Sequence, residues 1–163
     1  MILGDERFRL LGYVMDPRIE RLRAIHRLET GAHMDEYDQL IAELANHEPL
    51  DPALLPDLLL SLYDDTDGEE VMWGLLHLVE DFPAEAYAVA LVEALPRMVI
   101  HAKEWALLLL QRMVNSESDR LLLRDAYRAA GPEKQRLPRD LLAEIVAKNA
   151  VFAARVEQIT APF

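Results

Sequence analysis

A series of apolar stripes at helical spacing places the strongest constraint on the fold of this chain. The first stripe contains Ile19, Leu22, Ile25 and Leu28, and it follows Asp16-Pro17. An N-cap residue followed by proline at the first helical position is typical of a helix start. Similar stripes recur as far as the C-terminus, with two to six residues between them. Helices joined by such short loops are expected to be antiparallel neighbours.

The composition supports helices throughout. Leu, Ala, Glu and Arg dominate and there are only 6 glycines, which disfavours an all-β fold. We expect Gly31 to end the first helix, Asp67-Gly68-Glu69-Glu70 to form a capping box, and Pro96 to end the regular part of the fifth helix. The expected helices lie at about 17–30, from 35, at 54–63, 69–82, 83–98, 102–114 and 117–130, and from Pro132 or Pro138 toward Ile159.

A weak internal repeat suggests how these helices are arranged. A shift of 32 residues places Trp73 on Trp105 and Leu76 on Leu108. Helix pairs that recur at such a period are typical of an α-solenoid. The predicted fold is therefore all-α, with stacked antiparallel helical hairpins in a HEAT-like short α-solenoid or a compact helical bundle. We expect one domain over 1–163, made of an N-terminal extension with one helix (1–33), a repeat-like core (34–130) and one or more C-terminal helices (131–163).

The charge distribution is uneven. The formal net charge is −12, yet residues 28–96 contain 17 acids and no Lys or Arg. We call this stretch the acidic segment. Self-repulsion makes it a liability for stability, so it is either compositional drift or a surface for a basic partner. The Arg-rich stretch 18–27 is expected to be a solvated helix face that pairs with the acidic segment.

One expected helix, at 69–82, combines acids with a tryptophan on one narrow stripe, while the rest of its circumference is apolar. A tryptophan among carboxylates can anchor an interface by stacking on arginine; the alternative is that Trp73 belongs to the core. The helix at 102–114 has a thinner polar stripe that includes Arg112, and stacked hairpins would bring the two stripes together. The candidate partner-binding residues are Asp64, Asp65, Asp67, Glu69, Glu70, Trp73, His77, Glu80, Asp81, Glu104, Gln111 and Asn115.

Signs of catalysis or cofactor binding are poor. The lack of cysteine excludes thiol nucleophiles and Cys-ligated metals, and no phosphate-binding glycine motif occurs. His77-x-x-Glu80 and His101-x-x-Glu104 reverse the Glu-x-x-His order of di-iron bundles. We therefore expect no enzyme activity, no cofactor and no metal. The negative charge also argues against direct nucleic-acid or membrane binding, and the sequence predicts a cytoplasmic protein with no spanning or targeting segment.

Three stretches resemble the immunity protein 30 family of polymorphic-toxin and contact-dependent inhibition systems. They are Leu-Tyr-Asp-Asp-Thr at 62–66, Glu-Val-Met-Trp-Gly-Leu-Leu-His-Leu-Val-Glu at 70–80 and Glu-Trp-Ala-Leu-Leu-Leu-Leu-Gln-Arg-Met-Val-Asn-Ser at 104–116. The resemblance covers 54–127. It implies a small antidote that binds and blocks a cognate secreted toxin domain, often a nuclease with a basic cleft.

We expect the protein to be a monomer within a complex with the basic C-terminal domain of the toxin. One alternative is a HEAT-like adaptor or scaffold that binds a basic protein or peptide. A toxin gene immediately upstream would favour the antidote, and an isolated gene the adaptor. The other alternative, an enzyme with a metal in the bundle, would be tested by metal analysis of the purified protein.

Overall fold

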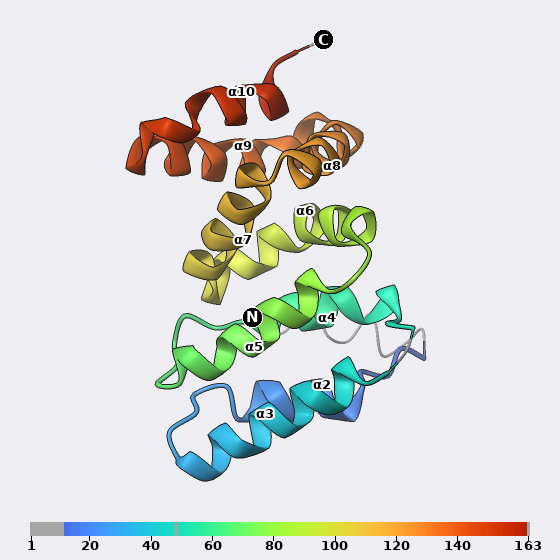
Figure 1. Ribbon diagram of the computed structural model, residues 1–163. Coiled ribbons are helices and arrows are strands. Elements are labelled where there is room, and N and C mark those ends of the chain that lie inside the picture. The colour runs from blue at the N-terminus through green and yellow to red at the C-terminus, as the bar shows by residue number, and fades with distance from the viewer. Residues whose placement is uncertain (1–11, 48, 163) are drawn as a thin grey trace.

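The protein is an array of helices in a computed structural model, which describes residues 12–47 and 49–162 (Figure 1). No strand occurs in these residues, so the predicted all-α class is confirmed. The elements in chain order are α2 (Pro17–Ala24), α3 (Gly31–Ala45), the short 3-10 helix η1 (Pro52–Leu54), α4 (Leu55–Leu59), α5 (Glu69–Glu80), α6 (Ala84–His101), α7 (Lys103–Asn115), α8 (Glu117–Ala129), α9 (Gly131–Lys148), the 3-10 helix η2 (Ala150–Phe152) and α10 (Ala153–Thr160).

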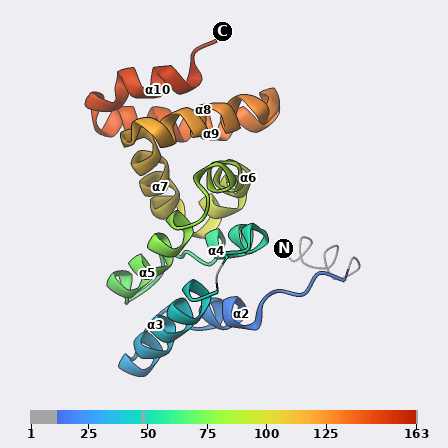
Figure 2. The ribbon, with the colours of Figure 1, turned by 45° about the vertical axis from the view of Figure 1, so that its right-hand side comes forward.

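Helix pairs stack on one another along the chain, from α2 and α3 at one end to α9 and α10 at the other (Figures 1 and 2). Helices that are two apart in the sequence pack together: α3 contacts α5, α4 contacts α6, α6 contacts α8, and α7 contacts α9. Such contacts are expected when successive hairpins stack, which is the predicted arrangement. A specific likeness to HEAT repeats remains a prediction.

Capping side chains and a continuous core hold the short helices in place. Asp16 accepts a hydrogen bond of 2.9 Å from the backbone N–H of Arg18 at the start of α2, as predicted. The hydroxyls of Thr30 and Ser116 cap α3 and α8 in the same way. One cluster of buried apolar side chains runs from Ile19 in α2 to Ile159 in α10. This burial supplies the stability that isolated helices of this length lack.

Prolines mark one predicted helix end that is wrong and one predicted helix start that is confirmed. Pro96 does not end the regular part of its helix, because α6 continues to His101. Pro96 itself is exposed, while its neighbours Leu95 and Met98 are buried. A proline in a helix interior costs about 3 kcal/mol, in part because it lacks an N–H donor. Core packing of the residues on both sides of Pro96 therefore keeps this segment helical. Of the two expected starts of the last helix, Pro132 is confirmed, because α9 starts at Gly131 and Pro138 lies inside it.

The predicted third and eighth helices are shorter than expected. Only Leu55–Leu59 is α-helical in the stretch 54–63. The predicted continuous C-terminal helix is broken at Asn149, whose backbone is extended (φ −150°, ψ 103°). The Asn149 side chain accepts a hydrogen bond of 3.2 Å from the N–H of Val151, which starts a new helical segment. Asparagine competes with helical hydrogen bonding in this way at chain breaks.

The first helix ends at Ala24, not at Gly31 as predicted, and Leu28 lies in the turn between α2 and α3. Leu28 is fully buried with a φ of 51°, and Gly31 is instead the first residue of α3. A Cβ atom on Gly68 would lie 2.6 Å from the Leu28 Cβ, so this close approach requires glycine. The predicted cap from Asp67 is also wrong. Gly68 is the N-cap of α5 and no side chain caps it.

Candidate partner-binding surface

Helices α5 and α7 lie on the same side of the stack and form the candidate surface, which we call the α5–α7 surface (Figures 1 and 2). The rings of Trp73 and Trp105 meet edge to face, with centroids 5.7 Å apart. Arg112 donates two hydrogen bonds, of 2.6 and 2.8 Å, to the Glu80 carboxylate. Both pairs join positions that are 32 residues apart, so residues equated by the sequence repeat are in contact.

Loop 60–68 connects α4 to α5 and fixes the start of α7. The backbone N–H of Asp64 donates to the carbonyl of His101 at 2.9 Å. The Asp64 carboxylate accepts hydrogen bonds from the backbone N–H groups of Glu104 at 3.0 Å and Trp105 at 3.4 Å. The N-cap residue of α7, Ala102, forms no side-chain hydrogen bond to these N–H groups. Asp64 therefore serves as a cap donated by a distant loop, where a carboxylate also suits the helix dipole.

Tyr63 and Asp65 of the same loop also contact other parts of the fold. The Tyr63 ring is stacked on His26 at 3.8 Å between centroids and lies 4.5 Å from the ring of His101. The indole N–H of Trp105 donates to the Tyr63 carbonyl at 3.0 Å. Asp65 accepts a hydrogen bond of 2.9 Å from Arg27. These contacts attach the loop to the turn that follows α2 and to α6 and α7.

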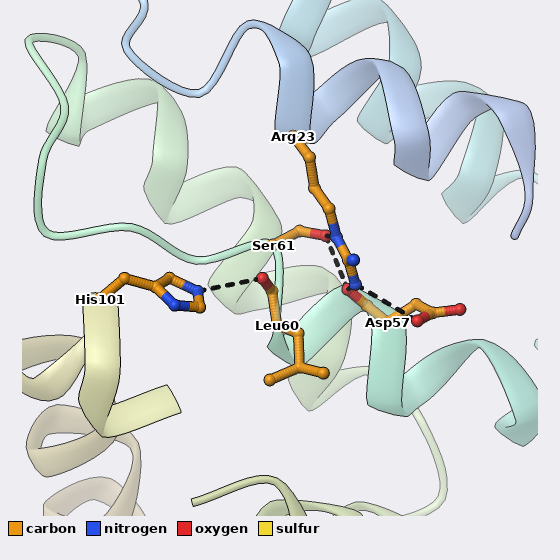
Figure 3. Close-up of polar contacts among 5 residues, drawn as sticks. All are labelled: Arg23, Asp57, Leu60, Ser61 and His101. Carbon is orange, nitrogen blue, oxygen red and sulfur yellow. Dashed lines mark hydrogen bonds and ion pairs between the residues drawn. The ribbon is translucent and has the colours of Figure 1, made fainter. Parts of the chain in front are cut away.

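A polar cluster beneath the loop joins α2 to α4 (Figure 3). Arg23 donates to the hydroxyl of Ser61 at 3.0 Å, to the carbonyl of Asp57 at 2.9 Å and to the Asp57 carboxylate at 3.2 Å. On the other side of the loop, His101 Nε2 lies 3.3 Å from the carbonyl of Leu60. Burial lowers the pKa of His101 from its ordinary value, although the bond to Leu60 acts in the opposite direction.

The predicted role of Trp73 remains a proposal, but its position is defined. Trp73 is half-buried, so it belongs neither to the closed core nor to a fully exposed stripe. The Arg112 guanidinium lies 5.9 Å from its ring centroid, and the His77 ring lies at the same distance. Part of the indole is therefore already covered by side chains of the chain itself, and the remainder is accessible to a partner.

Two hollows flank these residues at opposite ends of α5 and α7. One, of about 200 Å³, lies at the N-terminal ends of the two helices and is lined by Asp64, Thr66, Glu69, Glu104, Trp105 and Leu108. The other, of about 350 Å³, lies at their C-terminal ends, and we call it the Tyr87 hollow. Its lining residues are Glu80, Ala84, Tyr87, Arg112, Met113, Asn115, Ser116 and Asp119.

Comparison with known families identifies the chain. A sequence model described as Immunity protein 30 matches residues 24–123, which span α3 to α7 and enter α8. This chain belongs to the immunity protein 30 family. The match confirms the resemblance seen in the sequence, and it includes the whole α5–α7 surface. No curated protein and no solved structure matches the chain.

Membership of an immunity family implies that the protein neutralises a toxin by binding it, and such proteins are typically not enzymes. Within residues 12–47 and 49–162, no three or more His, Asp or Glu side chains are grouped so that they could hold a metal ion. The same residues contain no helix that is long and apolar enough to cross a membrane.

The candidate acids of this family member divide into two groups. Four carboxylates are already occupied: Asp64 caps α7, Asp65 pairs with Arg27, Glu80 pairs with Arg112, and Glu104 lies 4.0 Å from Lys148. The other four form no ion pair or side-chain hydrogen bond in the described part of the chain and are exposed: Asp67, Glu69, Glu70 and Asp81. We call these four the free acids.

The three remaining candidates lie on the same two helices. His77 is exposed, and its Nδ1 lies 3.8 Å from the Glu80 carboxylate. Gln111 is exposed on α7. Asn115, at the end of α7, accepts a hydrogen bond of 2.5 Å from Arg155 in α10. The helix candidates therefore lie on or next to α5 and α7, and several of them are held by other residues of the chain.

The acids of the acidic segment do not all lie on the α5–α7 surface, so the segment as a whole is not one surface for a partner. Asp57 is buried beside Arg23. Glu85 and Glu93 lie on α6, where they line a different hollow together with Pro52 and Pro56. Glu48 lies outside the described residues.

Three of the four arginines at 18–27 pair with the acidic segment as expected, whereas Arg18 pairs with Asp16. Arg21 binds Glu36, and Arg23 and Arg27 bind the acids described above. Tyr87 and Asp119 line the Tyr87 hollow but are not among the candidates from the sequence. No sequence signal marks them, because they come together only where four helix ends meet.

Proposed function

We propose that this protein neutralises its cognate toxin by binding it through the α5–α7 surface, and that the contacted face of the toxin is basic. The observation that carries the proposal is the group of free acids beside the half-buried Trp73. Carboxylates without an internal partner stay available to a basic protein, whereas paired ones would first have to give up a contact. A tryptophan next to them offers apolar area and a face for arginine.

The rigidity of the surface supports the same proposal. Loop 60–68 is attached to the turn that follows α2 and to α6 and α7 by backbone, side-chain and ring contacts. Trp73 and Trp105, together with Arg112 and Glu80, fix α5 relative to α7. A surface that is ordered before binding loses little conformational entropy when the partner arrives, which favours tight association.

The class of toxin is part of the proposal. A nuclease presents a basic cleft for phosphates, so a nuclease domain at the C-terminus of a secreted polymorphic or contact-dependent toxin fits an acidic surface. The α5–α7 surface would either cover this cleft or bind beside it and obstruct access. We propose that the immunity protein acts in the cytoplasm, as a monomer within the toxin complex.

Co-expression with the product of the neighbouring toxin gene tests this function. We expect a stable complex on copurification, and loss of toxin activity when the two proteins are mixed. Glu70→Lys/Asp81→Lys reverses two free acids and is expected to weaken the complex. Glu85→Lys/Glu93→Lys changes the net charge equally on α6 and is expected to have little effect. Equal weakening by the two variants would contradict the assigned surface.

A second candidate function is an adaptor that binds a basic peptide. The hollow of about 520 Å³ beside α6 favours it, because prolines and the exposed Val89 line a site that is flanked by Glu85 and Glu93. The two double variants distinguish the functions. A partner that is lost only with Glu85→Lys/Glu93→Lys would support the adaptor.

A further inference from the structure

We propose that the Tyr87 hollow receives a lysine side chain of the bound toxin. The proposal rests on the proposed function, and it assigns a chemistry to one partner residue at the edge of the α5–α7 surface. Four helix ends form the hollow: the ends of α5 and α7 and the starts of α6 and α8. Its volume of about 350 Å³ is sufficient for one long side chain.

Tyr87 carries an unused polar group at this site. The residue is only 5% exposed, and its hydroxyl is buried with no hydrogen-bond partner in the described part of the chain. A buried hydroxyl without a partner costs free energy, which a ligand that donates a hydrogen bond would recover. Burial, and then the nearby Glu80 carboxylate, raise the pKa of Tyr87, so the phenol stays neutral and can accept a hydrogen bond.

The charges around the hollow favour a cation. Glu80 and Arg112 form a two-bond ion pair and neutralise each other. Asp119, in the first turn of α8, has a carboxylate with no ion pair in the described residues; its backbone N–H donates to the hydroxyl of Ser116 at 3.4 Å. The side chains that line the hollow therefore leave one negative charge unbalanced, and that charge attracts a cation.

The hydrogen-bond acceptors that have no partner in the Tyr87 hollow suit a lysine ammonium better than an arginine guanidinium. The unpaired groups are a single carboxylate, on Asp119, and a single phenol oxygen, on Tyr87. A lysine ammonium has three donors around one point charge and can be shared between separate acceptors. An arginine instead prefers the flat two-oxygen edge of a carboxylate, and the edge offered by Glu80 is already bound to Arg112.

Nuclear magnetic resonance titration of the isotopically labelled full-length chain tests this inference. The probe is N-acetyl-lysine methylamide, and its uncharged counterpart N-acetyl-norleucine methylamide is the control ligand. We expect saturable shifts of the backbone amides of Tyr87, Asn115 and Asp119 with the lysine probe alone. Asp119→Asn is expected to weaken probe binding by about tenfold, because the amide can still accept a hydrogen bond but no longer carries the negative charge that attracts the ammonium.

The chain offers a matched control for the tyrosine. Tyr87→Phe removes the buried hydroxyl in the hollow and is expected to weaken the probe measurably. Tyr37→Phe removes the other buried hydroxyl without a partner in the described residues, on α3, and is expected to leave binding unchanged. A hollow that holds only water gives no saturable shift, which would overturn the inference. Equal binding of the norleucine probe, or full binding by Asp119→Asn and Tyr87→Phe, would do the same.

The outcome can be separated from that of the proposed function. A toxin that binds the wild-type protein and the Asp119→Asn variant equally well overturns the role of the hollow and leaves the proposed function intact. A wild-type protein that binds no toxin contradicts the proposed function itself.

Discussion

Asp64 and Asp65 in loop 60–68 and Glu69 and Glu70 on α5 are close in the sequence, yet they differ in whether another residue of the chain binds their carboxylates. In the loop, Asp64 caps α7 and Asp65 pairs with Arg27. On α5, Glu69 and Glu70 are exposed and have no ion pair among the described residues. The comparison shows that a run of acids in a sequence can combine structural groups with available ones, and that only their partners in the fold distinguish the two.

The same comparison explains what the family motif does. Leu-Tyr-Asp-Asp-Thr at 62–66 lies in the loop, where Tyr63 stacks on His26 and Thr66 accepts a hydrogen bond of 3.2 Å from the N–H of Gly68. This stretch, one of the three on which the resemblance to the family rests, therefore makes contacts within the fold. Recognition of the particular toxin is expected to depend instead on the free acids and Trp73.

The largest expected effect concerns the buried acid Asp57, which is paired with Arg23. Arg23→Met leaves the mostly buried Asp57 carboxylate without its arginine, and breaking such a pair costs about 3 kcal/mol of unfolding free energy. Urea denaturation measures the loss. The control is Arg21→Met, which removes an exposed pair with Glu36 and is expected to matter little. Equal losses in the two variants would mean that the polar cluster does not support the loop.

A smaller effect is expected for the capping acid. Asp64→Ala should cost about 1 kcal/mol, the usual loss when a helix cap is removed, and should speed hydrogen exchange in the first turn of α7. Chemical denaturation and exchange mass spectrometry measure both quantities. Asp67→Ala, three residues later, removes a free acid and should change neither. An Asp64→Ala protein with wild-type unfolding free energy and wild-type hydrogen exchange in α7 would show that Asp64 does not cap this helix.

The smallest effect is a pH dependence at His101. Because burial lowers the pKa of His101 in the folded state, its contribution to stability is fully present above the unfolded value of about 6.5. The contribution is lost as the pH falls from that value toward the lowered folded pKa. Unfolding free energies at about pH 7.5 and about pH 5.5 should therefore differ more in the wild type than in His101→Gln. An unchanged difference in the variant would place the pH dependence elsewhere.

Much of the fold could be predicted because local signals agree with the tertiary structure. Asp16-Pro17 starts α2 as expected, and the 32-residue shift correctly pairs Trp73 with Trp105. Local signals fail where contacts with residues distant in the sequence determine the backbone conformation. Pro96 stays helical because the core holds the residues on both sides of it, and Leu28 adopts a positive φ against Gly68.

The candidate surface was predictable only in outline. A helical wheel places Glu70, Trp73 and Glu80 on one stripe, but it contains no information on Arg112, which binds Glu80 from the next repeat. The roles of Asp64 and Tyr87 depend on other helices and cannot be obtained from spacing within one helix.

The association rate with the toxin tests the central claim most directly. Stopped-flow measurement at low and high salt would compare Glu70→Lys/Asp81→Lys with Glu85→Lys/Glu93→Lys. We expect the first variant to associate about tenfold more slowly at low salt and to lose most of the salt dependence, because free acids steer a basic partner. The second should behave like the wild type. Wild-type rates and salt dependence in the α5 variant would contradict the account.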